Sequence, residues 1–292
     1  MYKLLSIKKI LKKLYWLGCI GVIGTLFDIR ILELFYMFFL LAILDFILSL
    51  VIVLKSDSKL KEVSDLKFLF QNLGMLVGIP IIYIRNSFCL PNIKNYTSSN
   101  YYMLPFNDEW LVVNGGIDKV HSHSWGMCNQ RYAYDFFIVI DGLSHDSDGT
   151  DVKDYYCYEK PIIAPADGTV VELKNYFEDT PVTGKSEIKC TASDVRGNYI
   201  VIKHDNGEYS TIAHIKKNSF LVNIGDKVKQ RQEIAKCGNS GNTSEPHIHF
   251  QIQKGQSFLF DASLPIYFDS VETSINESIH YLTAGQSVKN RI

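Results

Sequence analysis

The chain has 292 residues, of which 47% are hydrophobic, and its formal net charge is −1. Because the chain has no basic surplus, it lacks the electrostatic footprint of a nucleic-acid-binding protein, and nucleic acid is not an expected partner. The apolar residues are unevenly distributed, with long apolar runs inside the first 85 residues. The roughly 190 residues that follow are enough for one hydrophobic core.

Residues 1–85 are expected to form an α-helical membrane region with two or three transmembrane helices. Ile31–Leu54 is apolar apart from Glu33 and Asp45. It exceeds the length of about 20 residues that a bilayer-spanning helix needs. Leu14–Phe27 is a shorter candidate. This region is therefore predicted to anchor the chain in a lipid bilayer.

Phe68–Ile84 is a third candidate span, interrupted by polar residues and by Pro80. The alternative for this segment is an interfacial or re-entrant helix. Lysines near the N-terminus favour a cytoplasmic start, and a second basic stretch, Lys55–Lys67, favours the cytoplasm as well. Three crossings satisfy both stretches and place the residues after 85 outside the cytoplasmic membrane.

The segment 86–103 is polar and turn-rich and is predicted to be a linker. From Leu104 onward, short alternating runs are separated by Gly, Asp and Asn, and helical periodicity is nearly absent. This pattern predicts a mainly β domain over residues 104–269. Gly142–Tyr158 and Glu178–Arg196 read as long inserted loops. Residues 270–292 are expected to form a loosely held polar tail.

A histidine pair carries the strongest chemical indication in the chain. His247 and His249 stand two residues apart on an expected strand, so both side chains point to the same face. Asp135 lies between apolar strand residues, where a buried carboxylate is costly unless it has a metal or a donor as partner. Histidine suits both metal binding and proton transfer near neutral pH. This set therefore predicts a metal site with an acid/base group beside it.

Four further segments support this set and together resemble one family, the lysostaphin-type (LytM-like) zinc metallopeptidases, which are peptidoglycan endopeptidases. The resemblance covers about residues 104–269. The matching segments, in the family's order, are residues 130–136, 161–171, 197–215, 225–234 and the histidine segment 238–253. The resemblance implies a β-sandwich or barrel-like catalytic domain of the LytM type (a duplicated hybrid motif) with a groove over one face.

The resemblance also implies the roles of individual residues. Asp135 and His249 are expected to bind one zinc ion, which needs three protein ligands and an open position. His247 is the expected general base, and His214 is expected to orient or stabilise the reacting groups.

One position departs from the family pattern. The usual first ligand stands four residues before the aspartate, and that place is Arg131 here, which cannot bind zinc. The upstream segment 121–125 offers two replacements, His121 and His123. His123, in a His-Ser-Trp setting, is predicted to be the third zinc ligand, and His121 is the rival.

The sequence thus predicts a membrane-anchored zinc metalloendopeptidase that hydrolyses peptide bonds in peptidoglycan stem peptides or cross-links. Its catalytic domain is expected outside the bacterial cytoplasmic membrane. The alternative is a catalytically degenerate protein that binds the wall or activates another cell-wall hydrolase, since degenerate relatives lose ligands. Lipoyl or biotinyl carriers share a similar hairpin, but no lysine sits in a convincing carrier turn here.

Overall fold

The computed structural model describes residues 59–189, 192–274 and 280–291, and before residue 59 it describes residues 29–39 and a few other positions. The chain forms two compact units, Met1–Leu66 and Lys67–Ile292. The first unit contains the short helix α3 (Arg30–Glu33) and the 3-10 helix η2 (Leu34–Phe39). The candidate spans Leu14–Phe27 and Ile31–Leu54 lie largely outside the described residues. In the part of the chain that is described, no helix is both long enough and apolar enough to cross a bilayer.

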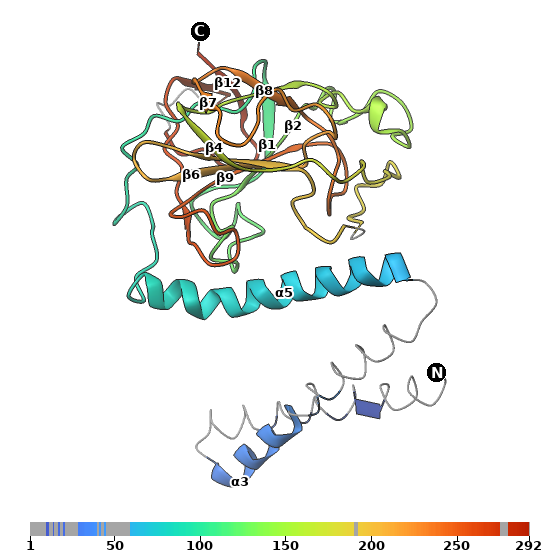
Figure 1. Ribbon diagram of the computed structural model, residues 1–292, viewed down its shortest axis with the longest axis vertical. Coiled ribbons are helices and arrows are strands. Elements are labelled where there is room, and N and C mark those ends of the chain that lie inside the picture. The colour runs from blue at the N-terminus through green and yellow to red at the C-terminus, as the bar shows by residue number, and fades with distance from the viewer. Residues whose placement is uncertain are drawn as a thin grey trace. The chain divides into compact units, whose positions relative to one another are not determined.

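The helix α5 (Lys59–Arg85) contains the third candidate span, Phe68–Ile84. From Lys67 onward it belongs to the second unit, where it lies against loops that connect the β-strands (Figure 1). The approach is close at Gly78, where a Cβ atom would meet the carbonyl oxygen of Leu259 at 2.1 Å. Ile82 is buried in the same contact beside Cys128 and Ala262. The compact unit therefore begins near residue 67, well before the expected domain start at Leu104.

Short extended segments fill the rest of the second unit, as the alternating pattern predicts. Its only helix beyond α5 in the described part is the 3-10 helix η3 (Val152–Asp154). The strands are β1 (Trp110–Asn114), β2 (Tyr134–Phe137), β3 (Pro161–Ile163), β4 (Gly168–Lys174), β5 (Tyr199–Lys203), β6 (Tyr209–Ala213), β7 (Lys227–Val228), β8 (Glu233–Lys236), β9 (Ile248–Gln253), β10 (Ser263–Leu264), β11 (Val271–Thr273) and β12 (Ser287–Asn290). The mainly β prediction is confirmed.

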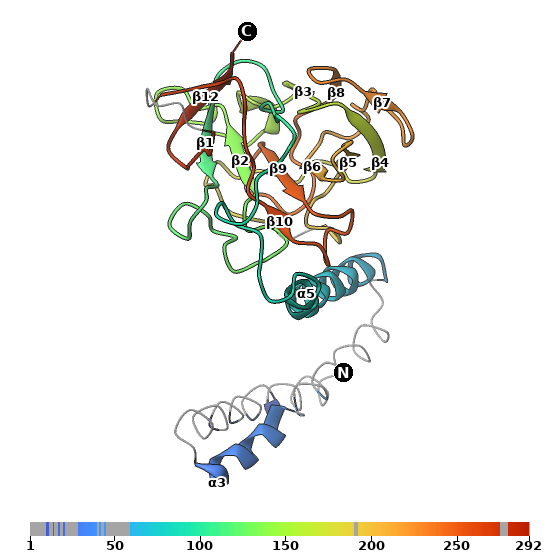
Figure 2. The same cartoon turned by 90° about the vertical axis from the view of Figure 1, so that its left-hand side faces the viewer.

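The strands form two antiparallel sheets (Figure 2). The large sheet has the order β11-β12-β1-β2-β9-β6-β5-β4-β7, with β10 added to β9, and the small sheet is β3-β8. Buried residues of both sheets meet in one hydrophobic cluster, which joins Phe136 and Phe250 of the large sheet to Ile162 and Ile234 of the small one. This core fixes β2 and β9 side by side at the centre of the large sheet, where the candidate site lies.

The expected linker, 86–103, is held against the β-strands through one buried carboxylate. Glu208, 3% exposed, accepts hydrogen bonds from Ser98 Oγ at 2.8 Å and Tyr102 Oη at 2.5 Å, and also from Tyr96 Oη. Three donors satisfy a carboxylate that would otherwise be costly to bury. The segment therefore packs as part of the compact unit.

The expected polar tail, 270–292, instead contributes two strands to the large sheet. β12 pairs with both β1 and β11 and so extends the sheet at one edge. Three buried apolar side chains, Val271, Leu282 and Val288, anchor the described parts of this segment. The tail prediction was wrong because these residues are widely spaced in a polar stretch. The two long loops, 142–158 and 178–196, are present as predicted, and their described residues contain no β-strand.

Candidate active site

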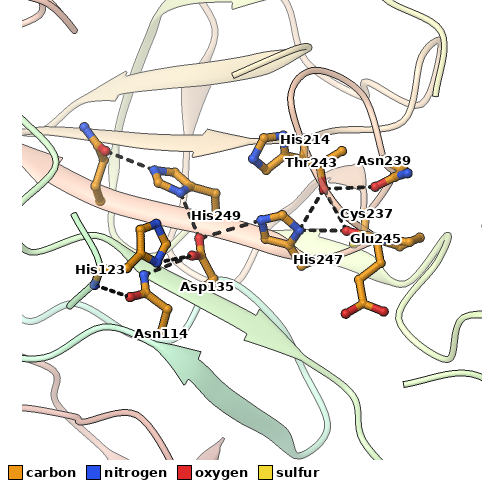
Figure 3. A network of polar contacts seen from close by, with 12 residues as sticks. Asn114, His123, Asp135, His214, Cys237, Asn239, Thr243, Glu245, His247 and His249 are labelled. Atoms are coloured by element: carbon orange, nitrogen blue, oxygen red, sulfur yellow. Dashed lines mark hydrogen bonds and ion pairs between the residues drawn. The ribbon is translucent and has the colours of Figure 1, made fainter. Parts of the chain in front are cut away.

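Asp135 and His249 lie directly opposite each other on the neighbouring strands β2 and β9. Residues opposite each other in an antiparallel pair share a face of the sheet, so the two side chains meet. His249 Nδ1 lies 2.9 Å from Asp135 Oδ1, and His249 Nε2 lies 3.0 Å from the side-chain oxygen of the buried Gln251 (Figure 3). Both nitrogens of the imidazole therefore face an acceptor oxygen.

His123 reaches the same carboxylate from the loop between β1 and β2. Its Nδ1 lies 4.0 Å from Asp135 Oδ2. Asn114, at the end of β1, connects the two: its side-chain Nδ2 donates to Asp135 Oδ2 at 2.9 Å, and its Oδ1 accepts from the backbone N–H of His123 at 2.9 Å (Figure 3). Sequence reasoning missed Asn114 and Gln251, although each lies on a strand beside a predicted ligand.

His121, the rival candidate, points elsewhere. Its Nδ1 lies 2.9 Å from the carboxylate of Asp118. Of the two candidates, the structure brings His123 to Asp135, while His121 pairs with a residue of its own loop. The assignment of His123 as a zinc ligand stays a prediction.

Arg131, which occupies the place of the family's usual first ligand, holds the loop that carries His123. Its Nε donates to the backbone carbonyl of Trp125 at 3.0 Å, and its guanidinium lies over the Trp125 ring at 5.1 Å from the centroid. Its own backbone carbonyl accepts a hydrogen bond from Ser122 Oγ at 2.9 Å. The residues on both sides of His123 are thus tied to Arg131.

His214 and His247 stand beside this group with fixed tautomers. His214 Nδ1 lies 2.8 Å from the carbonyl oxygen of Ser240, and His247 Nδ1 lies 2.8 Å from that of Glu245. A carbonyl oxygen only accepts hydrogen bonds, so each Nδ1 carries the proton and each neutral ring keeps a lone pair on Nε2. His247 Nε2 lies 3.7 Å from Asp135 Oδ1, and the two imidazole centroids are 4.5 Å apart.

The backbone at His214 lies in the left-handed region, with φ of 61°. A non-glycine residue in this region is strained, and such strain persists only where surrounding contacts over-determine it. The backbone N–H of His214 donates to the carbonyl of Arg196, and its carbonyl accepts from Gly238. These contacts present the His214 ring to the site.

The electrostatics of the site separate the roles of the three buried histidines. Burial lowers the pKa of His214 well below its ordinary value, and the neighbouring His247 and His249 lower it further. Burial also lowers the pKa of His247, although the charge of Asp135 opposes the shift. Burial disfavours the charged form of His249 too, but the hydrogen bond and charge of Asp135 outweigh it and raise its pKa. His214 and His247 are therefore neutral near neutral pH.

Asp135 is ionised in this setting. Burial alone would raise the pKa of its carboxyl group, but the hydrogen bond from His249 and the charges of the surrounding histidines lower it. The site thus combines a buried anion with two neutral imidazoles, His214 and His247. His249 would release its additional proton on binding a divalent metal, because a metal ligand must be deprotonated.

The distances between the candidate donor atoms can be compared with those in a tetrahedral zinc site. As the side chains stand, no group of three or more His, Cys, Asp or Glu within the described ranges is arranged to hold a metal ion. Two ligands about 2.0–2.1 Å from a tetrahedral zinc ion lie about 3.3 Å apart. The His249–Asp135 distance of 2.9 Å is shorter than this value, and the His123–Asp135 distance of 4.0 Å is longer. Side-chain rotations would therefore be needed to bring these donors to ligand spacing.

The hydrogen bonding of His249 favours a cation at this place. If Nε2 donates to the Gln251 oxygen, Nδ1 turns a lone pair toward the carboxylate of Asp135. Two lone pairs at 2.9 Å repel each other unless a proton or a cation lies between them. A metal-bound histidine usually donates its other ring N–H to an oxygen acceptor, which is the role Gln251 fills. The residues therefore fit a zinc ion held by His123, Asp135 and His249.

These side chains open into a groove of about 260 Å³. Its lining residues are Val113, Asn114, His123, Gln130, Asp135, Phe137, Ile188, Val195, Arg196, Ala213, His214, Asn242, Thr243, Ser244, His247 and His249. The set mixes apolar side chains with a few convergent polar groups, as in binding sites generally. All five predicted site residues are in it.

Residues of the inserted loop 178–196 form one wall of the groove. Backbone hydrogen bonds join this loop to the loop that carries His247. Lys189 N–H donates to the Thr243 carbonyl at 3.1 Å, and Asn242 N–H donates to the Val195 carbonyl at 3.1 Å. The helix α5 holds the same wall from the other side, because Gln71 Oε1 accepts from Val195 N–H at 2.8 Å. The groove is therefore built on contacts that reach back to residue 71.

Comparison of the chain with known proteins identifies its family. Residues 145–260 match the profile of peptidase family M23, a range that contains His214, His247 and His249. The chain is 35% identical over 99 residues to lipoprotein NlpD of Yersinia enterocolitica. The aligned region covers 34% of this chain and 82% of NlpD. The chain belongs to peptidase family M23. The resemblance drawn from the motifs is confirmed.

Other M23 relatives are longer proteins. Peptidoglycan DD-endopeptidase ShyA of Vibrio cholerae is 30% identical over 92 residues, which is 32% of this chain and 17% of ShyA. An uncharacterized metalloprotease of Buchnera aphidicola is 33% identical over 85 residues, 29% of this chain and 22% of that protein. The chain thus spans about a fifth of the length of these curated relatives.

Two examples illustrate the solved structures that match. One is LytU, with 27% identity over 36% of this chain and 62% of the other chain and a TM-score of 0.28. The other is the catalytic domain of lysostaphin from Staphylococcus simulans, with 20% identity, coverage of 54% and 88%, and a TM-score of 0.31.

Proposed function

We propose that this M23 protein is a zinc-dependent endopeptidase that hydrolyses peptide bonds in the stem peptides or cross-links of peptidoglycan. The observation that carries the proposal is the convergence of five side chains, from β2, β9 and three loops, on one groove. Relatives named peptidoglycan DD-endopeptidases support the choice of substrate.

The mechanism follows from which atoms face the groove. Zinc held by His123, Asp135 and His249 would polarise the scissile carbonyl and lower the pKa of a water molecule. His247 is the general base in this proposal, because its Nε2 lone pair faces Asp135 at 3.7 Å while its Nδ1 proton is held by Glu245. The proton that His247 accepts is then available for the leaving amine.

His214 acts beside it as an acceptor. Its Nδ1 proton is committed to the Ser240 carbonyl, so Nε2 orients the attacking water by accepting a hydrogen bond from it. To stabilise a developing oxyanion, this ring would first need a second proton. The structure therefore favours the orienting role among the two expected for His214.

The alternative of a degenerate wall-binding protein is not favoured. It was suggested by Arg131, which replaces a family ligand. Here the loop that Arg131 holds brings His123 to within 4.0 Å of Asp135, so a third donor stands beside the other two.

We further propose that the N-terminal region anchors the chain in the bacterial cytoplasmic membrane, with the catalytic domain outside. The substrate class and the apolar stretch Ile31–Leu54 support this placement. Because α5 packs on loops of the second unit from Lys67 onward, the proposal requires an odd number of crossings before that helix.

The test is digestion of purified, cross-linked peptidoglycan by the full chain in detergent, with released peptides separated and identified by mass spectrometry. The proposal predicts peptide release that stops on chelation and returns with one equivalent of zinc. Release of sugar fragments alone, or no cleavage by zinc-loaded protein, would contradict it.

A further inference from the structure

Phe137 is an aromatic residue of the groove that the chemistry described so far does not use. It stands two residues after Asp135 on β2, so the two side chains share one face of the sheet. The neighbouring Phe136 faces the other way and packs in the core against Phe106 and Tyr134. Phe137 is 6% exposed and lies outside that core cluster, in the wall of the groove.

The ring of Phe137 lies flat against His247. The ring centroids are 4.9 Å apart and the planes differ by 4°. Offset stacking of this kind stabilises an aromatic contact beyond the area that it buries. His247 itself is only 7% exposed.

This contact restricts a rotation that the hydrogen bond of His247 restrains only in part. The bond from Nδ1 to the Glu245 carbonyl limits rotation of the imidazole about Cβ–Cγ. A hydrogen bond tolerates a range of angles, and the terminal torsion of histidine has a broad energy profile, so this limit is soft. A flat neighbour parallel to the ring narrows the remaining rotation. The two contacts together direct Nε2 toward Asp135.

We propose that Phe137 is a positioning residue that holds the plane of His247 for proton transfer. The inference rests on the proposed function, in which His247 is the general base. It predicts that Phe137→Leu, which keeps an apolar side chain but loses the flat face, lowers kcat at least about tenfold and changes KM less than about twofold. A small misplacement of a catalytic group can cost about a hundredfold in rate. Phe137→Tyr keeps the stacked ring and should retain kcat within about threefold of wild type.

The experiment measures peptide release from peptidoglycan by the full chain over a range of substrate concentrations, together with zinc content and the unfolding temperature. Val113→Ala is the matched control, because Val113 lines the same groove from β1, a different strand from that of Phe137. Its expected effect is the reverse, a higher KM with little change in kcat. A merely structural role for Phe137 would lower the unfolding temperature and leave kcat of the folded enzyme unchanged.

A second readout needs no activity. In full chain labelled with ¹⁵N-histidine, the ring of His247 should give one sharp set of signals in wild type and Phe137→Tyr, and broadened or doubled signals in Phe137→Leu. Wild-type kcat or an unchanged His247 spectrum in Phe137→Leu overturns the inference. If wild type releases no peptides, the proposed function fails, while the spectra still decide whether Phe137 positions His247.

Discussion

The guanidinium of Arg131 lies 5.1 Å from the ring centroid of Trp125, and its Nε donates to the Trp125 carbonyl. Trp125 also packs edge-on against Tyr132, with ring centroids 5.7 Å apart. Arg131 and Tyr132 thus both contact Trp125 and hold the loop between β1 and β2 in place. The residue that stands in the place of a family ligand thus supports the loop from which another donor, His123, reaches Asp135.

Arg131→Ala should weaken zinc binding without removing a ligand. The variant frees the Trp125 carbonyl and the loop that carries His123, and loss of such supporting contacts typically costs about 10–100-fold in metal affinity. Competition with a zinc-binding dye measures this affinity. Arg291→Ala, an arginine replaced at the far edge of the sheet, is the control and should bind zinc as wild type does. Unchanged affinity in Arg131→Ala would show that the loop holds its position without the arginine.

His123→Ala should lose zinc, and His121→Ala should keep it. The reason is that His123 faces Asp135 at 4.0 Å while His121 pairs with Asp118. Zinc held by Asp135 and His249 alone lacks the third protein ligand that such sites need. Metal analysis of both variants decides the question. Loss of metal in His121→Ala with retention in His123→Ala would refute the assignment, and retention in both would favour the degenerate alternative.

Asp194, in the wall of the groove, should contribute stability that disappears in acid. Burial alone would raise the pKa of its carboxyl group, but hydrogen bonds and charge from Arg196, with a hydrogen bond from Gln71, lower it. A carboxyl group whose pKa is lower in the folded state stabilises the fold above its unfolded pKa, about 3.9, and this stability is lost as the pH falls through the folded value.

The measurement is the unfolding temperature as a function of pH. Asp194→Asn should be less stable than wild type near neutral pH, and the difference should shrink below about pH 4. The exposed Asp146→Asn serves as control and should follow the wild-type curve. A difference that stays constant down to pH 2 would contradict the linkage.

Reporter fusions after Lys61 and after Tyr102 should report the same side of the membrane. The reason is that α5 packs against loops of the second unit through Gly78 and Ile82 and through an ion pair between Arg85 and Asp261 at 3.1 Å. A helix held in this way stays on the side of the domain to which it is bound. Opposite sides for the two fusions would mean that Phe68–Ile84 crosses the bilayer and that the packing is lost there.

The sequence predicted the parts of the site that lie on regular strands and in recognisable motifs. Asp135 and His249, which the family resemblance grouped in one site, lie opposite each other on β2 and β9. Asn114 could not be placed, because the register of β1 with β2 shifts between Val112 and Asn114. A one-residue slip moves a side chain to the opposite face, and composition gives no sign of such a bulge.

Long-range packing was the other limit. The contact of Phe137 with His247 depends on the pairing of β2 with β9, which brings together residues far apart in sequence. The docking of α5 was also hidden, because an apolar helix that packs on a domain has the same local pattern as one in lipid. Only the structure distinguishes the two cases. At Gly78 the absence of a side chain allows the Leu259 carbonyl to approach the helix closely.

The most direct test of the central claim compares zinc content and peptide release in wild type, His247→Ala and His249→Ala, each as full chain in detergent. The account predicts about one zinc per chain in wild type and in His247→Ala, little zinc in His249→Ala, and loss of most peptide release in both variants. Undiminished cleavage by metal-free wild type would contradict the claim, and loss of zinc in His247→Ala with retention in His249→Ala would exchange the two roles.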